Sequence, residues 1–329
     1  MINWTSSLDA YRGWVNANGS VDSGTEVEDV PQGNGSQMFW VGKEEDMKKV
    51  KVLYYLHGGG FFLLLDGSAM LFLDDVAKGV EKATPGVKVS IAVLDYSTSD
   101  SAILLWQTAN PLIALLPNAQ MPTPLQQAVA GLHHILSLGV NPEDIQLIGD
   151  SAGGNLVLQL LLHGAHPVQG NNILPLDLSG RKLGGAYLMS PFFIMTPRNV
   201  FSSWKAYDGI DSVSAEAFAT FGYQVLMSTV KKPGLLPYVD QSYRPDGWYE
   251  GLERVVERIL VTAGGNECLK DDIVEVSEAI RVMHPRTTLL VDARGVHDEP
   301  LADYGAGETR VGELTPVIKE WIKECFNAK

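Results

Sequence analysis

Residues 145–155 constrain the fold more than any other part of this sequence. The short apolar run Ile145–Ile148 leads into Gly-Asp-Ser-Ala-Gly at residues 149–153, and a segment with helical character follows at Asn155–His163. Small residues on both sides of a serine permit a sharp strand-to-helix turn in which bulky side chains would clash. The pattern therefore predicts a strand, a tight turn and a helix, with Ser151 raised above the edge of a sheet.

Short apolar segments and helical segments alternate along most of the 329 residues. The expected strands are Val50–Leu56, Val87–Leu94, Ile145–Ile148, Leu183–Met189, Ile259–Thr262 and Thr287–Val291, and expected helices include Leu8–Val15 and Pro124–Leu138. Such alternation favours an α/β fold with a mostly parallel central sheet flanked by helices. Residues 192–248 break the rhythm, because they hold two helix-like segments, Val200–Tyr207 and Ala215–Ser228, and no convincing strand. We expect one domain over residues 1–329.

The composition excludes several classes of partner. Asp and Glu number 39 against 25 Lys and Arg, and the net charge of −14 disfavours nucleic acid and anionic membranes. No signal peptide is visible and no apolar stretch is long enough to span a bilayer, so we expect a cytoplasmic protein. Cys268 and Cys325 are expected to be free thiols. The glycine loops lack the spacing of nucleotide-binding motifs, and we expect neither a cofactor nor a metal.

A second glycine-rich motif points to acyl chemistry at Ser151. His57-Gly58-Gly59-Gly60 follows the expected strand Val50–Leu56. Glycines at such a place let backbone N–H groups turn toward a ligand, and the N–H of Ala152 lies at a helix N-terminus, where negative charge is stabilised. These groups are the expected oxyanion hole for a serine nucleophile, with His57 and Asp150 as the supporting polar residues of the two motifs.

The serine needs a base and an acid in loops that follow later strands, in the chain order serine, acid, histidine. His297 follows the expected strand Thr287–Val291, whereas the other histidines lie in the glycine loop, on or beside helices, or in a polar connection. The acid is expected after Ile259–Thr262, where Glu267 is the first candidate. Asp271 is the alternative, although it can equally be a first-turn acid that stabilises a helix N-terminus.

Together these motifs resemble the hormone-sensitive-lipase-like family of α/β hydrolases, from about Val50 to Asp303. The segments 261–272 and 297–301 look closest to the fungal carboxylesterase branch, although the family often carries Asp where this chain has Glu267. The resemblance implies the α/β-hydrolase fold with a helical cap built from about residues 1–35 and 192–248. It also implies hydrolysis of small or medium apolar carboxylic esters, with Gly59 and Gly60 as oxyanion donors and Gly58 supporting the turn.

One segment departs from the family pattern. After Asp95-Tyr96 the chain continues into a long apolar segment, 97–117, which is either a wall or lid of the substrate pocket or a helix packed on the core or on a second subunit. A homodimer is therefore an expectation left open. The same motifs would also serve a biosynthetic deacylase, lactonase, thioesterase or acyltransferase, or a small-molecule receptor on this scaffold.

Overall fold

The computed structural model describes residues 6–18, 24–96, 120–170, 172–197, 202–308 and 312–327. Its centre is one sheet of eight strands in the order β1-β2-β4-β3-β5-β6-β7-β8. The strands are β1 (Glu26–Asp29), β2 (Gln37–Val41), β3 (Val50–Leu56), β4 (Lys88–Asp95), β5 (Ile145–Asp150), β6 (Gly185–Met189), β7 (Ile259–Gly264) and β8 (Thr287–Asp292). In this spatial order every neighbouring pair from β4 onward is parallel. The pairs β1–β2 and β2–β4 are antiparallel. The predicted α/β class and mostly parallel sheet are confirmed.

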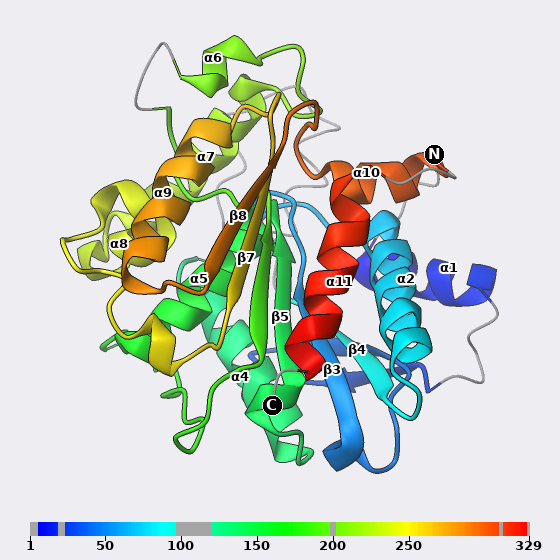
Figure 1. Ribbon diagram of the computed structural model, residues 1–329. Coiled ribbons are helices and arrows are strands. Elements are labelled where there is room, and N and C mark those ends of the chain that lie inside the picture. Colours follow the sequence, from blue (N-terminus) through cyan, green and yellow to red (C-terminus); the bar gives the residue numbers. More distant parts are fainter. Residues whose placement is uncertain are drawn as a thin grey trace.

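Helices cover both faces of the sheet (Figure 1). One layer contains α1 (Ser7–Asn18), α2 (Gly67–Ala83), α10 (Glu299–Ala306) and α11 (Leu314–Asn327). The other layer contains α4 (Thr123–Ser137), α5 (Ser151–Ala165) and α9 (Lys270–Met283). Helices on both faces are the usual arrangement for a parallel sheet, because each crossover connection places a helix against one face.

The strand β3 shows why the central strands read as continuous apolar runs. Val52 and Tyr54 point into the core beneath α4 and α5, whereas Leu53 and Tyr55 point into the core beneath α2 and α11. Successive side chains of a strand alternate between faces, so a strand covered on both sides needs apolar residues at every position. Burying each large apolar side chain stabilises the fold by about 1.5–3 kcal/mol. This gain explains the apolar run Val52–Leu56, whereas the half-buried Lys51 near the start of β3 pairs with Asp144.

The antiparallel edge of the sheet was not predicted. The strand β1 reads Glu-Val-Glu-Asp and its side chains are exposed or half-buried, so the sequence there carries no apolar pattern. The strand β2 is only five residues long, and all but its first residue are buried. Periodicity alone does not distinguish a short run of this kind from a buried helix segment.

Residues 192–248, called the insertion below, lie between β6 and β7. Its described helices are α6 (Ser203–Ala206), α7 (Ala215–Thr229) and α8 (Leu236–Val239), and no strand occurs in the described part of this segment. The insertion is tied to the main body by the buried Asn155 of α5, whose Nδ2 donates to the carbonyls of Phe192 at 2.7 Å and Val239 at 2.8 Å.

The predicted cap of residues 1–35 and 192–248 stays a prediction, and β1 lies within the first of these segments. The apolar segment 97–117, for which a wall, a lid and a packed helix were the alternatives, lies outside the described residues.

Candidate active site

Ser151 lies at the junction between β5 and α5, as the Gly-Asp-Ser-Ala-Gly pattern predicts. Its φ of 48° is in the left-handed region, which is strained for a residue with a side chain. The turn is also closely packed, because a Cβ on Gly153 would lie 1.9 Å from the carbonyl oxygen of Leu56. Only glycine allows the helix to start this close to the end of β3, and the close approach places Ser151 at the carboxyl edge of the sheet.

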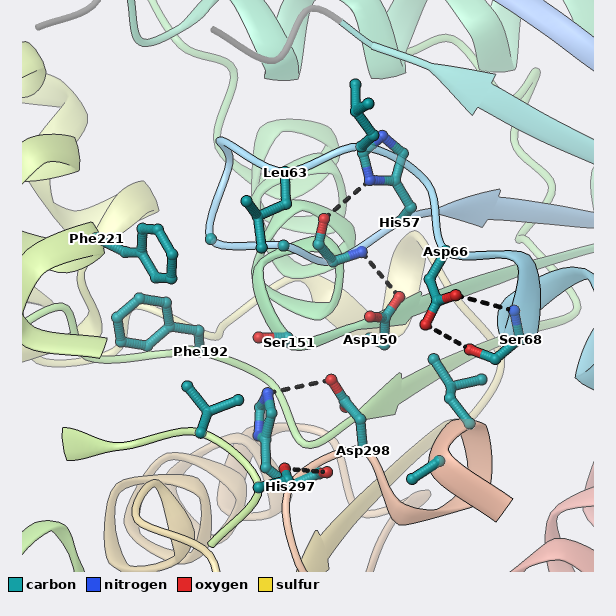
Figure 2. Close-up of a pocket in the computed structure, with 18 of the residues that line it drawn as sticks. His57, Leu63, Asp66, Ser68, Asp150, Ser151, Phe192, Phe221, His297 and Asp298 are labelled. Atoms are coloured by element: carbon teal, nitrogen blue, oxygen red, sulfur yellow. Dashed lines mark hydrogen bonds and ion pairs between the residues drawn. The ribbon is translucent and has the colours of Figure 1, made fainter. Parts of the chain in front are cut away.

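The glycine loop follows β3 and lies beside Ser151 (Figure 2). Gly58 donates its backbone N–H to Oδ1 of Asp150 at 2.9 Å, and the hydroxyl of Tyr55 donates to the same oxygen. A Cβ on Gly58 would come within 2.1 Å of the other carboxylate oxygen of Asp150. The carboxylate of Asp150 therefore holds the loop against the serine turn, and it occupies the N–H of Gly58, which the motif had included in the expected oxyanion hole.

Several backbone donors lie near Ser151 without an acceptor in the part of the chain that the structure describes. Among the described residues none accepts a hydrogen bond from the N–H of Gly59 or Gly60. Ala152 is the second residue of α5, and the first four N–H groups of a helix have no partner within it. Three backbone donors next to a serine can stabilise a negative charge that develops on an oxygen.

The predicted base and acid lie in neighbouring loops. His297 follows β8 and lines the same cavity as Ser151, and Glu267 follows β7. Nδ1 of His297 is 3.9 Å from Oε2 of Glu267, and both side chains are buried. Neither Nδ1 of His297 nor Oε1 of Glu267 has a hydrogen-bond partner among the described residues. The carboxylate of Glu267 thus lies within ion-pair distance of this buried nitrogen.

Ser190 holds Glu267 in place and was missed by the sequence reasoning. Its hydroxyl donates to Oε2 of Glu267 at 2.6 Å, and the backbone N–H of Gly264 donates to the same oxygen at 3.0 Å. Burial raises the pKa of Glu267 to about 7, although His297 and these two donors oppose the change. The signal for Ser190 was available, since it directly follows β6 at the edge where the other loops meet.

Asp298 is a second residue that the sequence reasoning missed. Its Oδ2 lies 3.1 Å from Nε2 of His297, and the contact is drawn in Figure 2. Burial by itself lowers the pKa of His297. The carboxylate of Asp298 and, to a smaller degree, those of Glu267 and Asp211 outweigh burial and raise the pKa to about 9. Burial raises the pKa values of Asp298 and Asp150, and repulsion from Asp298 adds to the effect on Asp150.

Asp271, the alternative acid, does not face His297. Its carboxylate accepts from the backbone N–H of Ser203 at 2.8 Å and lies in the first turn of α9. The other histidines lie elsewhere: ring nitrogens of His133, His163 and His284 lie within 3.0 Å of backbone carbonyls, that of His134 lies 2.9 Å from Glu28, and His166 stacks on Trp248. Of the seven histidines, His57 and His297 line the cavity beside Ser151.

The cavity has a volume of about 310 Å³ and two chemically different sides. Phe192 and Phe221 lie on one side of Ser151, and Asp298 and Asp66 lie on the other (Figure 2). His57 forms part of its wall, stacked on Tyr96, and burial lowers the pKa of His57 to about 4, so its ring is neutral at pH 7. The cavity can therefore hold an apolar group next to the serine hydroxyl.

Other expectations concern groups outside this cavity. Cys268 and Cys325 are both unpaired and buried, as predicted. Within the described ranges no cluster of three or more His, Cys, Asp or Glu side chains is arranged to hold a metal ion. No helix in the part of the chain that the structure describes combines the length and apolar character needed to cross a membrane.

Known structures show that the chain has the fold of the α/β hydrolases. An esterase of the bacterial hormone-sensitive lipase family superposes with a TM-score of 0.66 at 20% identity, over 99% of this chain and 93% of that one. Carboxyl esterase 2 of the fungus Tuber melanosporum gives a TM-score of 0.67 at 14% identity, over 93% and 88% of the two chains. An esterase of Rhizomucor miehei gives 0.65 at 16% identity, over 98% and 90%. The α/β-hydrolase fold implied by the motifs is confirmed.

The chain belongs to the steryl acetyl hydrolase family, whose sequence model matches residues 25–311. A protein of Schizosaccharomyces pombe that is named as a steryl acetyl hydrolase is 22% identical over 262 residues, which are 78% of this chain. The match spans 62% of that relative's length. The fungal resemblance predicted from the acid and histidine segments agrees with this membership.

Proposed function

We propose that this protein is a serine esterase that hydrolyses carboxylic esters through an acyl-enzyme on Ser151. The observation that carries the proposal is the meeting of three features at one cavity: a strained serine, free backbone donors and a histidine backed by a buried carboxylate. Membership of the steryl acetyl hydrolase family supports the same chemistry.

In the proposed mechanism neutral His297 takes the hydroxyl proton as the oxygen of Ser151 attacks the ester carbonyl. The N–H groups of Gly59, Gly60 and Ala152 stabilise the oxyanion, each by about 3 kcal/mol. The imidazolium then protonates the departing alcohol, and water releases the acyl group by the same route. Glu267 stabilises the imidazolium through Nδ1, which requires the 3.9 Å separation to shorten as the ring gains charge.

We further propose that the substrate combines a small acyl group with an apolar alcohol. Phe192, Phe218 and Phe221 give the cavity an aromatic wall next to Ser151. The name of the Schizosaccharomyces pombe relative, a steryl acetyl hydrolase, supports this substrate class. An acetate ester of a sterol joins a two-carbon acyl group to a large apolar alcohol.

The replacement Ser151→Ala tests the mechanism. We expect hydrolysis of p-nitrophenyl acetate to fall by about 10⁶ in kcat, because removing the nucleophile disables the whole triad. A fluorophosphonate probe should label the wild-type protein and leave the variant unlabelled. An unchanged rate in a folded variant would exclude Ser151 as the nucleophile.

An ester panel tests the substrate class separately. Acetate, butyrate and octanoate esters of one alcohol measure the acyl preference. Acetates of alcohols of increasing size measure the preference for the alcohol. We expect acetates of bulky apolar alcohols to give the highest kcat/KM. A preference for long acyl chains on small alcohols would contradict the assignment.

A further inference from the structure

The insertion reaches into the loop that carries Glu267. Cys268, the next residue, donates its backbone N–H to Oδ2 of Asp211 at 2.7 Å. Its carbonyl accepts from the hydroxyl of Ser203 at 2.6 Å. Both polar backbone groups of Cys268 are therefore bonded to side chains of the insertion, so the position of Glu267 depends on a segment more than 50 residues earlier in the chain.

The same short segment also holds the backbone of His297. The N–H of His297 donates to Oδ1 of Asp211 at 2.8 Å, and its carbonyl accepts from the hydroxyl of Ser212 at 3.0 Å. One carboxylate thus bonds two loops at once, with one oxygen on the loop after β7 and the other on the loop after β8. The two loops carry the proposed acid and the proposed base.

We propose that Asp211 is a positioning residue for the reaction, fixing the distance between Glu267 and His297 by bridging their backbones; this inference rests on the proposed function. A carboxylate suits the task because it accepts at both oxygens, and hydrogen bonds to a charged acceptor are about twice as strong as neutral ones. An asparagine of the same shape would present one oxygen and one NH₂ group, which would face a backbone N–H.

The bridge also connects the proposed triad to the substrate wall. Ser212 and Val213 follow Asp211 directly and line the cavity. Phe218 of α7 packs edge-on against the ring of His297 with 4.9 Å between ring centroids. The segment that holds the two loops is therefore the segment that contacts substrate, and Asp211 sets the geometry of both together.

The test compares Asp211→Asn with Asp208→Asn. Asp208 lies three residues earlier, and its carboxylate accepts from the N–H of Ala215 at 3.0 Å, within the insertion. Both variants remove one negative charge from the same segment, but only Asp211→Asn breaks a bond to the two loops. On p-nitrophenyl acetate we expect Asp211→Asn to lower kcat by roughly tenfold to a hundredfold, since small displacements of catalytic groups cost this much. We expect KM to stay within about twofold.

The pH profile separates positioning from a general loss of folded protein. The carboxylates that face His297 and raise its pKa are those of Asp298, Glu267 and Asp211, whereas burial lowers it. Asp211→Asn should therefore move the acid limb of kcat/KM to lower pH, and Asp208→Asn should leave it in place. Asp211→Glu, which keeps both oxygens, should recover part of kcat.

The proposal is overturned if Asp211→Asn matches Asp208→Asn in kcat. It is also overturned if Asp211→Asn loses activity only in proportion to unfolded protein, measured by thermal denaturation, with the acid limb unmoved. Failure of the proposed function would look different, because the wild-type protein itself would then not react with the fluorophosphonate probe.

Discussion

Nε2 of His297 lies 3.1 Å from Oδ2 of Asp298, its own neighbour in the sequence. Burial lowers the pKa of His297, but this carboxylate and those of Glu267 and Asp211 outweigh burial and raise it to about 9. A general base must be neutral to accept a proton, so activity should increase as the pH rises through this pKa. We predict that kcat/KM increases from pH 6 to pH 9, with its midpoint above the ordinary histidine value of about 6.5. A plateau reached by pH 6 would contradict the prediction.

Asp298→Asn should shift that profile. Removing the carboxylate removes the largest of the effects that raise the pKa of His297, so the midpoint should move to lower pH. Asp303→Asn is the matched control, because it removes an equal charge on α10, where its carboxylate accepts from the N–H of Gly312 at 2.6 Å. Identical profiles for the two variants would show that Asp298 does not act on His297.

The choice between the two candidate acids is tested by Glu267→Gln and Asp271→Asn. Glu267→Gln should lower kcat by roughly a thousandfold or more, because the amide cannot stabilise the imidazolium. Asp271→Asn should change kcat by only a few-fold, since that carboxylate bonds the backbone of Ser203. The opposite order in steady-state rates on p-nitrophenyl acetate would make Asp271 the acid.

Asn155→Leu should destabilise the protein without touching the reacting groups. The replacement leaves the carbonyls of Phe192 and Val239 without this donor, and an unsatisfied buried group costs about 1–3 kcal/mol. We expect the free energy of unfolding to fall by about 2–4 kcal/mol. Urea denaturation followed by tryptophan fluorescence measures it, and an unchanged midpoint would show that the bonds contribute nothing.

Stability at acidic pH should depend on Glu28. Burial by itself raises the pKa of Glu28. Hydrogen bonds donated by Lys43, His134 and Trp40 outweigh burial and lower the pKa to about 2. A carboxyl group with a lowered pKa stabilises the fold above its unfolded value of about 4.5, and this stability is lost as the pH falls toward 2. Glu28→Gln should remove about 1 kcal/mol at pH 7 and flatten the decrease between pH 4.5 and 2. If the free energy of unfolding fell equally for the wild-type protein and Glu28→Gln between pH 7 and pH 3, the prediction would be contradicted.

Much of the central sheet could be predicted because its information is local. The strand β3 has the predicted bounds, Val50–Leu56, since an apolar run is bounded there by lysines and a glycine loop. The helix α6, Ser203–Ala206, is shorter than the predicted segment Val200–Tyr207. The strand β1 was missed because most of its residues are charged. Pairing with β2, not its own composition, makes that segment a strand.

In the proposed site, too, the residues with a local sequence signal were predicted and the others were not. Ser151 and Gly58 were identified from sequence because a tight turn or a close approach restricts which residues fit. Ser190 had only its place directly after β6 as a signal, and Asp211 had none, because a serine or an aspartate in a loop carries no recognisable local pattern. Asp211 meets Cys268 and His297 across 57 and 86 residues of sequence, and only the folded arrangement of the loops brings them together.

The bonds between the insertion and the two loops matter for anyone who builds chimaeras. Exchanging residues 192–248 for the equivalent part of a relative is an obvious way to alter substrate range. The exchange would also replace the side chains of Ser203, Asp211 and Ser212, and so the supports of two backbone segments that the graft does not include. A donor sequence should therefore be chosen first for two serines and a carboxylate at those places, and only then for the shape of its binding wall.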